Sequence, residues 1–92
     1  MKKRKNYKEL EKIVKGFSNH RRIEIMEILH KKPGLSLFEI AEYLDVNFRT
    51  ISEHTRRLVV AGLIFKRADI NFVRHELTRR GKAVLVFLGT LE

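Results

Sequence analysis

The fold of this 92-residue chain is decided by residues 37–62, which read LFEIAEYLDVNFRTISEHTRRLVVAG. A short helix is predicted at 37–44, because apolar residues recur there at i, i+3, i+4 and i+7: Leu37, Ile40, Ala41 and Leu44. Asp45-Val46-Asn47 predicts a tight turn, and Asn47 is a good N-cap for a second helix at 47–61 that stops at Gly62. Two helices joined so closely are typical of a helix-turn-helix, whose second helix enters the major groove of DNA.

The flanking sequence predicts two further helices before this stretch and a hairpin and a helix after it. The first helix spans 7–17; the second is capped by Ser18 or Asn19, ends before Pro33-Gly34 and is the central buried helix. Strands are expected at 63–65 and 72–77 around a tip at 68–71, where Asp69 and Asn71 suit a turn. Thr78 caps a last helix, and Gly81 would let it approach its neighbour closely.

The expected fold is therefore mainly α with a small β-hairpin, in the order ααααββα. The hairpin after the helix-turn-helix is the wing of a winged helix-turn-helix. We expect one domain at 7–91, whose first and last helices serve dimerisation, behind a flexible basic tail at 1–6. That tail, with Lys2-Lys3-Arg4-Lys5, could bind the DNA backbone or could be a frayed, solubilising terminus.

The charge balance favours a polyanionic partner. The chain has 20 Lys and Arg against 11 Asp and Glu, a formal net charge of +9, and 11 of the basic residues lie in residues 1–35.

Cysteine is absent, which excludes disulfides and thiolate metal sites and favours the cytoplasm. The longest apolar run, 83–88, is far shorter than the roughly 20 residues of a membrane span, and no signal-peptide pattern is present. Glycine-rich phosphate loops and zincin spacings are also absent, so an enzyme is not expected.

The second helix of the motif has one apolar and one basic side. With an advance of about 100° per residue, His54, Thr55, Leu58 and Gly62 fall within roughly 60° of Ile51. The opposite side carries Arg49, Ser52, Glu53, Arg56 and Arg57. Arginine can donate two hydrogen bonds to guanine, while serine or glutamate can read other base edges. The alternative is a solvated outer face, but the acidic residues Glu39, Glu42 and Asp45 on the preceding helix show that basic charge is not spread at random.

The candidate DNA-contacting residues lie on this helix and on the wing at 66–74. Phe48 could touch a thymine methyl or pack against the start of the preceding helix, and Asn47 is interpreted as a cap rather than a base reader. Wing residues would meet phosphates or the minor groove, positioning the protein without reading sequence. The full set is Phe48, Arg49, Thr50, Ser52, Glu53, Arg56, Arg57, Lys66, Arg67, Asn71 and Arg74. A winged-helix module for protein contact or RNA binding is the alternative function.

Three motifs carry a family resemblance over about two thirds of the chain. The first runs from Ser18 to Leu29; the second is Glu39-Ile40-Ala41-Glu42-Tyr43-Leu44 followed by Asn47-x-x-Thr50-Ile51-Ser52-x-His54 and Leu58-x-x-Ala61-Gly62-Leu63-Ile64. The third is Leu77-Thr78-x-x-Gly81-x-x-Val84-Leu85. With these motifs the chain resembles the ArsR-type and MarR-type winged helix-turn-helix regulators. The resemblance implies a transcriptional regulator that binds specific double-stranded DNA.

The same resemblance implies a homodimer built from the first and last helices. Expected interface residues are Leu10, Val14, Val84, Phe87 and Leu88, and the two recognition helices would lie about 34–36 Å apart, one DNA turn. The last helix is apolar nearly all round at 83–88, so it needs more than one partner surface. The alternative is a monomer in which this helix folds over its own core.

The chain departs from the metal-sensing ArsR-type members. Where they carry a cysteine pair it has Ser36-Leu37-Phe38, and where others have last-helix ligands it has only Glu92. His20, His30, His54 and His75 are not spaced as a ligand set. We therefore expect no metal and no cofactor. A small-molecule effector stays open, although a domain this small leaves little room for a pocket.

Overall fold

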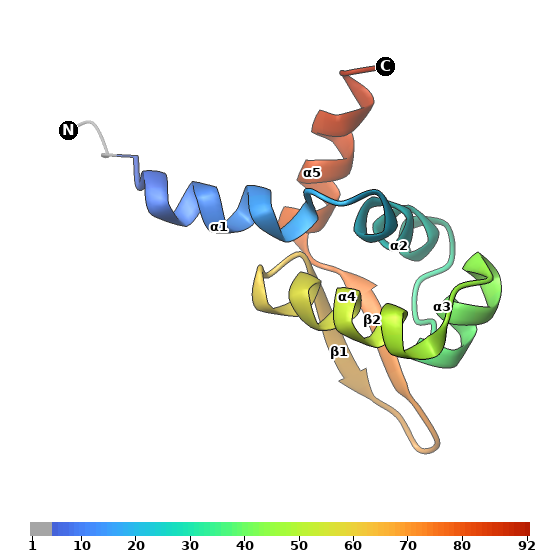
Figure 1. The fold of residues 1–92 in the computed structure, drawn as a ribbon. Coiled ribbons are helices and arrows are strands. Elements are labelled where there is room, and N and C mark those ends of the chain that lie inside the picture. The colour runs from blue at the N-terminus through green and yellow to red at the C-terminus, as the bar shows by residue number, and fades with distance from the viewer. Residues whose placement is uncertain (1–4) are drawn as a thin grey trace.

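The predicted order ααααββα is confirmed by the computed structural model, which describes residues 5–92 (Figure 1). The elements are α1 (Tyr7–Phe17), α2 (His20–Lys31), α3 (Leu37–Leu44), α4 (Phe48–Val60), β1 (Ile64–Ala68), β2 (Val73–Leu77) and α5 (Arg79–Gly89). Residues 1–4 of the predicted tail lie outside the described residues. Asn6, which was assigned to that tail, is instead the N-cap of α1, because its Oδ1 accepts a hydrogen bond from the Glu9 N–H at 3.1 Å.

Capping residues fix where α3 begins, where it ends and where α4 begins. Helix α3 begins with a capping box, in which Ser36 Oγ accepts from the Glu39 N–H at 3.2 Å and Glu39 Oε1 accepts from the Ser36 N–H at 2.9 Å. It ends at Asp45, whose φ of 53° is left-handed and reverses the chain. Asn47 then caps α4, as predicted.

The hairpin differs from its predicted bounds by a few residues. Strands β1 and β2 are antiparallel, with Ile64 opposite Leu77 and Ala68 opposite Val73. Leu63 was predicted in the first strand, but its N–H is bonded to the carbonyl of Leu58 in the last turn of α4 and does not donate to the neighbouring strand; only its carbonyl accepts a bond from there, from the N–H of Thr78. The tip is Asp69–Phe72, closed by a bond from the Asp69 N–H to the Phe72 carbonyl at 2.8 Å.

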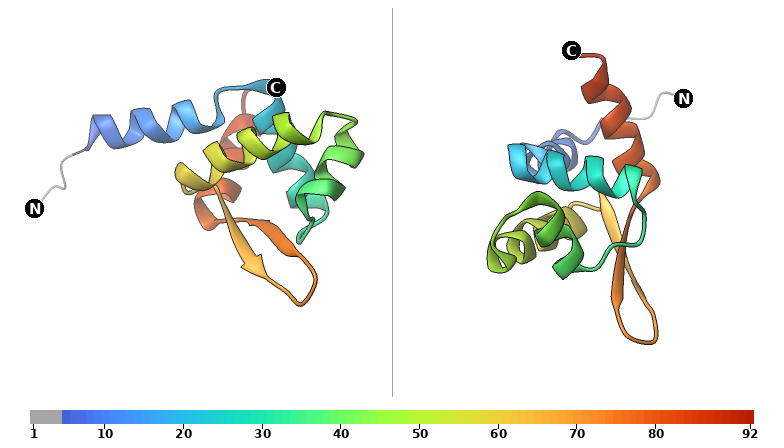
Figure 2. Two further views of the ribbon diagram at one scale, coloured as in Figure 1. Left: turned by 60° about the horizontal axis from the view of Figure 1, so that its bottom comes forward. Right: turned by 90° about the vertical axis from the view of Figure 1, so that its right-hand side faces the viewer.

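Helix α2 lies at the centre of the molecule, as predicted, and contacts all the other helices and β2. Its buried Ile25, Met26 and Leu29 pack with residues of α3, α4 and the hairpin: Ile40, Ile51, Leu58, Ile64 and Leu77. Helix α1, helix α5 and the hairpin project from this core in three directions (Figures 1 and 2). Within residues 5–92 there is no helix of the length and apolarity that a membrane crossing requires.

Two glycines let neighbouring elements approach closely. A Cβ on Gly16 would overlap the Cβ of Ala61, so Gly16 is what allows α1 to lie against the end of α4. A Cβ on Gly81 would overlap the carbonyl oxygen of Leu63, which confirms the close approach predicted for the last helix. The neighbour at Gly81 is the segment that leads into β1.

Candidate nucleic-acid interface

The first turn of α4 carries Arg49, whose guanidinium is not bonded to any other group within residues 5–92. Asn47 Oδ1 accepts from the Arg49 N–H at 2.8 Å and, at a longer 3.4 Å, from the Thr50 N–H, which orients the first turn. The side chains of Arg49 and Thr50 are both exposed. Within residues 5–92 the Arg49 guanidinium has no hydrogen-bond or ion-pair partner, so all its donors are available to a ligand.

The middle of α4 carries an intrachain ion-pair cluster. Arg56 donates from Nη2 and Nε to the two oxygens of Glu53 at 2.8 and 3.1 Å, and Arg57 Nε donates to Oε1 at 3.2 Å. These bonds hold the pKa of Glu53 down at about 2. Glu53 was predicted as a base reader, and in the structure its carboxylate is shared by two arginines. A DNA contact by Glu53, or by the donors that these bonds occupy, has to replace them, whereas Nη1 of Arg56 and both Nη atoms of Arg57 have no partner within residues 5–92.

The buried side of α4 is the predicted one. Ile51, Thr55 and Leu58 are buried and His54 is half-buried. His54 Nδ1 lies 3.2 Å from Nη1 of Arg22, a residue that sequence reasoning missed and that is only 8% exposed. Burial, followed by the charges of Arg22 and Arg57, lowers the pKa of His54. The sequence did contain a signal for Arg22, because it precedes Ile25, Met26 and Leu29 at i, i+3, i+4 and i+7.

Phe48 packs against the start of α3. Its ring stacks on that of Phe38, with centroids 4.4 Å apart and an interplanar angle of 21°. Of the two roles left open for Phe48, the structure supports packing against the preceding helix. Both rings keep an exposed edge, with Phe48 40% and Phe38 72% exposed.

The cationic residues of the wing lie on two different faces. Strand alternation and register put Lys66 opposite His75 on one face, and Arg67 opposite Arg74 on the other. Lys66 and the tip residue Asn71 line a shallow groove together with Phe38 and Phe48, and so face the start of α4.

The arginines of the wing are engaged within the chain. Arg67 pairs with Glu76 at 2.8 Å. Arg74 donates to Asp69 at 2.7 Å and to the carbonyl of Gly34 at 3.0 Å, tying the wing to the loop before α3. The sequence treated the three wing cations as one set, whereas the register separates Lys66 from the two arginines.

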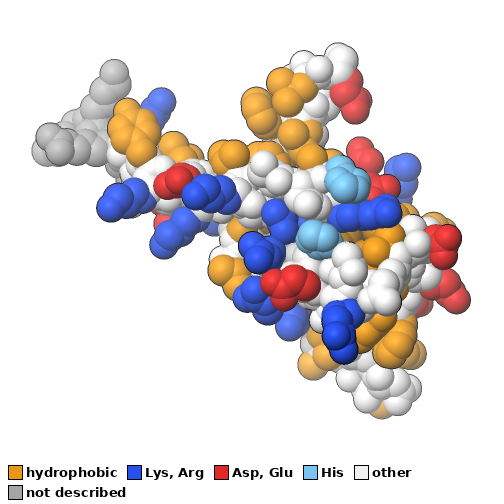
Figure 3. Space-filling model, in the orientation of Figure 1, with side chains coloured by type: hydrophobic (Ala, Val, Ile, Leu, Met, Phe, Trp, Pro, Cys, Tyr) orange, Lys and Arg blue, Asp and Glu red, His pale blue; other side chains and the backbone are white. Residues whose placement is uncertain are grey.

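Basic side chains gather on one face of the molecule. Figure 3 shows Lys and Arg side chains along α1 and over α4 on the face turned toward the viewer. Acidic side chains of α3, Glu42 among them, are exposed as expected. The α4 face therefore adjoins a second basic element, α1, which the sequence had assigned only to dimerisation.

The predicted dimer residues divide into two groups. Leu10, Val14 and Phe87 are about half exposed, and Leu88 is half-buried. Val84 is buried in the core of its own chain, so its prediction as an interface residue is corrected: it is on the side of α5 that faces Leu77 and α2 rather than outward. Val86, which was not predicted, is exposed on α5.

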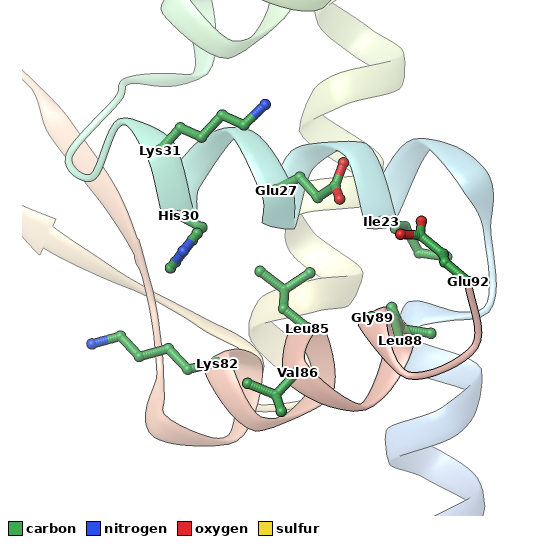
Figure 4. A pocket seen from close by; sticks show the side chains of 10 residues that line it. All are labelled: Ile23, Glu27, His30, Lys31, Lys82, Leu85, Val86, Leu88, Gly89 and Glu92. Carbon is green, nitrogen blue, oxygen red and sulfur yellow. The ribbon is translucent and has the colours of Figure 1, made fainter.

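A groove of about 340 Å³ separates α2 from α5 (Figure 4). Leu85 points from α5 toward α2, while Glu27, His30 and Lys82 stand around the rim. Across residues 5–92, no three His, Cys, Asp or Glu side chains are grouped so that they could hold a metal ion. The four histidines lie on three elements: His20 and His30 on α2, His54 on α4 and His75 on β2.

Comparison with known proteins agrees with this geometry. A family described as winged helix-turn-helix DNA-binding matches residues 18–64. A Halobacterium salinarum protein named as an arsenical resistance operon repressor is 34% identical over 78 residues, which are 84% of this chain and 60% of that protein. The chain thus spans less than two thirds of that relative's length.

Solved structures show the same fold. HlyU from Vibrio cholerae superposes with a TM-score of 0.81 at 27% identity over 97% of both chains. A homodimeric winged helix-turn-helix DNA-binding domain from Mycobacterium bovis has a TM-score of 0.80 at 20% identity, over 99% of this chain and 88% of that one. These findings confirm the resemblance expected from the sequence, and the matched family is one of DNA-binding domains rather than of enzymes. The chain belongs to the winged helix-turn-helix DNA-binding family.

Proposed function

We propose that the chain is a transcriptional regulator that binds specific double-stranded DNA with α4 in the major groove. The observation that carries the proposal is the exposed side of α4, which follows α3 through a capped three-residue turn and presents an unpaired Arg49. A capped first turn holds this guanidinium at the end of the helix that reaches base edges in helix-turn-helix complexes. The chain's net charge of +9 supports attraction to a polyanion.

Base reading falls mainly to the first two turns of α4. Arg49 can donate two hydrogen bonds to O6 and N7 of a guanine, and the hydroxyls of Thr50 and Ser52 can bond to any base edge within reach. Arg56 and Arg57 would contact phosphates, either through the donors that Glu53 leaves free or by exchanging its carboxylate for DNA oxygens.

Within the wing, we assign the DNA contact to Lys66 and Asn71. Both line the groove that faces Phe48, so they lie on the same side of the hairpin as the start of α4. Arg67 and Arg74 instead hold the wing in place, through Glu76, Asp69 and the carbonyl of Gly34. Phe48 supports α4 by stacking on Phe38 rather than by touching a base.

We further propose a homodimer that acts in the cytoplasm and has no catalytic activity. The related Mycobacterium bovis domain is homodimeric. In this chain Leu10 and Val14 on α1, with Val86 and Phe87 on α5, leave apolar surface exposed. A dimer joined through these helices would present two α4 helices to half-sites about 34–36 Å apart.

Selection of duplexes from a random pool, followed by sequencing, tests the proposal. We expect a palindromic site whose half-sites are spaced by about one helical turn. Arg49→Ala should weaken binding to that duplex by about 1–3 kcal/mol and relax the sequence preference at one position of each half-site. The matched control is Arg79→Ala, which also removes one exposed arginine but lies at the start of α5.

Two outcomes would refute the assignment. An Arg49→Ala footprint and affinity like those of the wild type would show that Arg49 does not read a base and would remove the observation that carries the proposal. No enriched duplex, combined with selection of structured RNA from a parallel pool, would favour the RNA-binding alternative.

A further inference from the structure

Helix α1 carries a stripe of lysines along one side. Lys8, Lys12 and Lys15 are spaced by four and three residues, so they fall within roughly 60° of one another around the helix axis. All three side chains are exposed. We call these three residues the lysine stripe.

The C-terminal part of the lysine stripe, Lys12 and Lys15, lies beside α4 because of a glycine. Gly16, buried in the last turn of α1, leaves no room for a Cβ against Ala61, the C-cap of α4. The two helix ends therefore touch, and Lys12 and Lys15 line one groove of about 540 Å³ together with Arg56 and Arg57. Figure 3 shows the cationic side chains of α1 and α4 on the same face of the molecule.

Much of the charge on the lysine stripe is available to a partner. Lys15 pairs with Glu11 at 3.0 Å, but both side chains are more than half exposed, and such a pair contributes little and is easily exchanged. Lys8 and Lys12 form no ion pair within residues 5–92. Glu9 at the rim of the groove partly offsets the charge.

The lysine stripe stays open even when α1 takes part in a dimer. The exposed apolar residues Leu10 and Val14 lie roughly 100° or more around the helix from each lysine of the stripe. A second copy that covers the apolar side of α1 would leave the lysines facing the same way as α4.

We propose that the lysine stripe binds the phosphate backbone of the duplex just outside the segment read by α4. The proposal rests on the function proposed above and extends its footprint. The stripe spans about 10 Å along the helix, at 1.5 Å per residue, and one DNA strand carries a phosphate every 3.4 Å of axis, so three lysines match about three successive phosphates. Helix α1 thereby acts as a second anchor, opposite the wing across α4.

The test compares two variants of equal charge by salt titration of DNA affinity. The stripe variant is Lys8→Gln/Lys12→Gln/Lys15→Gln; the control is Lys31→Gln/Arg79→Gln/Lys82→Gln, which removes three exposed cations from α2 and α5. Each is titrated with the selected site in a duplex of roughly 20 base pairs, and with the same site in a duplex of roughly 40, which adds flanking DNA on both sides. Sedimentation shows whether each variant keeps the mass of the wild type.

On the longer duplex the slope of log K against log salt should be shallower in the stripe variant than in the control by about 0.9 for each lost phosphate contact, or close to 3 per protomer. On the short duplex the two slopes should agree. A stripe variant whose slope equals that of the control on both duplexes overturns this proposal while leaving the α4 assignment intact. A wild-type chain that binds no duplex overturns both.

Discussion

Gly16→Ala is the substitution that most directly tests how α1 is held on the domain. An alanine Cβ at this position would overlap the Cβ of Ala61, and the Cδ1 of Leu63 would lie 3.5 Å away on the other side. Because the obstruction on α4 is attached directly to the backbone, no rotation of a side chain relieves it. The ends of α1 and α4 must therefore move apart.

The expected cost comes from two opposing contributions. Forcing one extra methyl into a packed contact costs about 1–3 kcal/mol. Alanine is better than glycine in a helix interior by about 1 kcal/mol, and by less in the last turn, where Gly16 lies. The free energy of unfolding should therefore fall by about 1–2 kcal/mol, and in a domain of this size each 1 kcal/mol lowers Tm by about 4–8 °C.

Urea unfolding followed by circular dichroism measures this effect. A second substitution, at Ala61, should reverse the loss of stability. Gly16→Ala/Ala61→Gly exchanges which helix carries the methyl, so the double variant should recover most of the stability lost in the single one. Gly89→Ala is the control, because a Cβ there meets nothing within 4 Å. The packing argument would be refuted if the Gly16→Ala variant were as stable as the wild type. It would also be refuted if the double variant were no more stable than Gly16→Ala.

Three further predictions concern the wing, the dimer and pH. Lys66→Ala should reduce the slope of log K against log salt by about 1 and Arg67→Ala should not; equal reductions would contradict the separation of their faces. Phe87→Asp should give monomers in sedimentation, and an unchanged mass would exclude α5 from the interface. Burial keeps the pKa of His75 below its ordinary value, so the unfolded chain takes up the proton first. The free energy of unfolding from urea titration should therefore fall as the pH drops below about 6.5, with His75 contributing at most about 1.4 kcal/mol per pH unit, and it should fall less steeply in His75→Gln.

The helices were predictable because their signals are local. Helix α3 was predicted to the residue, since its apolar spacing and its neighbouring polar and turn residues all lie within Ser36 to Asn47. Strand β1 was predicted less well, because its start at Ile64 depends on the N–H of Leu63 bonding to the carbonyl of Leu58 rather than to the neighbouring strand. Gly81 was correctly predicted as a close approach, but only the fold shows that it meets the backbone of Leu63.

The sequence predicted which side of α4 is exposed, but not which cationic side chains are free of partners within the chain. Helical geometry alone separates the exposed Arg49 from the buried Ile51 on α4. Which wing cation faces α4 depends on the register that pairs Lys66 with His75, and register is a property of the folded hairpin. The inward direction of Val84 likewise follows from how α5 packs on α2 and β2.

We expect the ion pairs on α4 to determine which residues supply DNA affinity. Two donors of Arg56 already bond to a carboxylate, so a phosphate contact by those donors exchanges one charge-assisted hydrogen bond for another and the net gain is small. Glu53 stays ionised at any physiological pH, because its pKa is about 2, and an arginine that leaves it exposes a negative charge toward DNA. Arg49 and Lys66 have no such partner within residues 5–92 and gain the full contact. DNA affinity should therefore come mainly from Arg49 at the start of α4, Lys66 on the wing and the lysine stripe, in which only Lys15 has an exposed ion pair. The Glu53 cluster should penalise any site that does not offer acceptors in the right place.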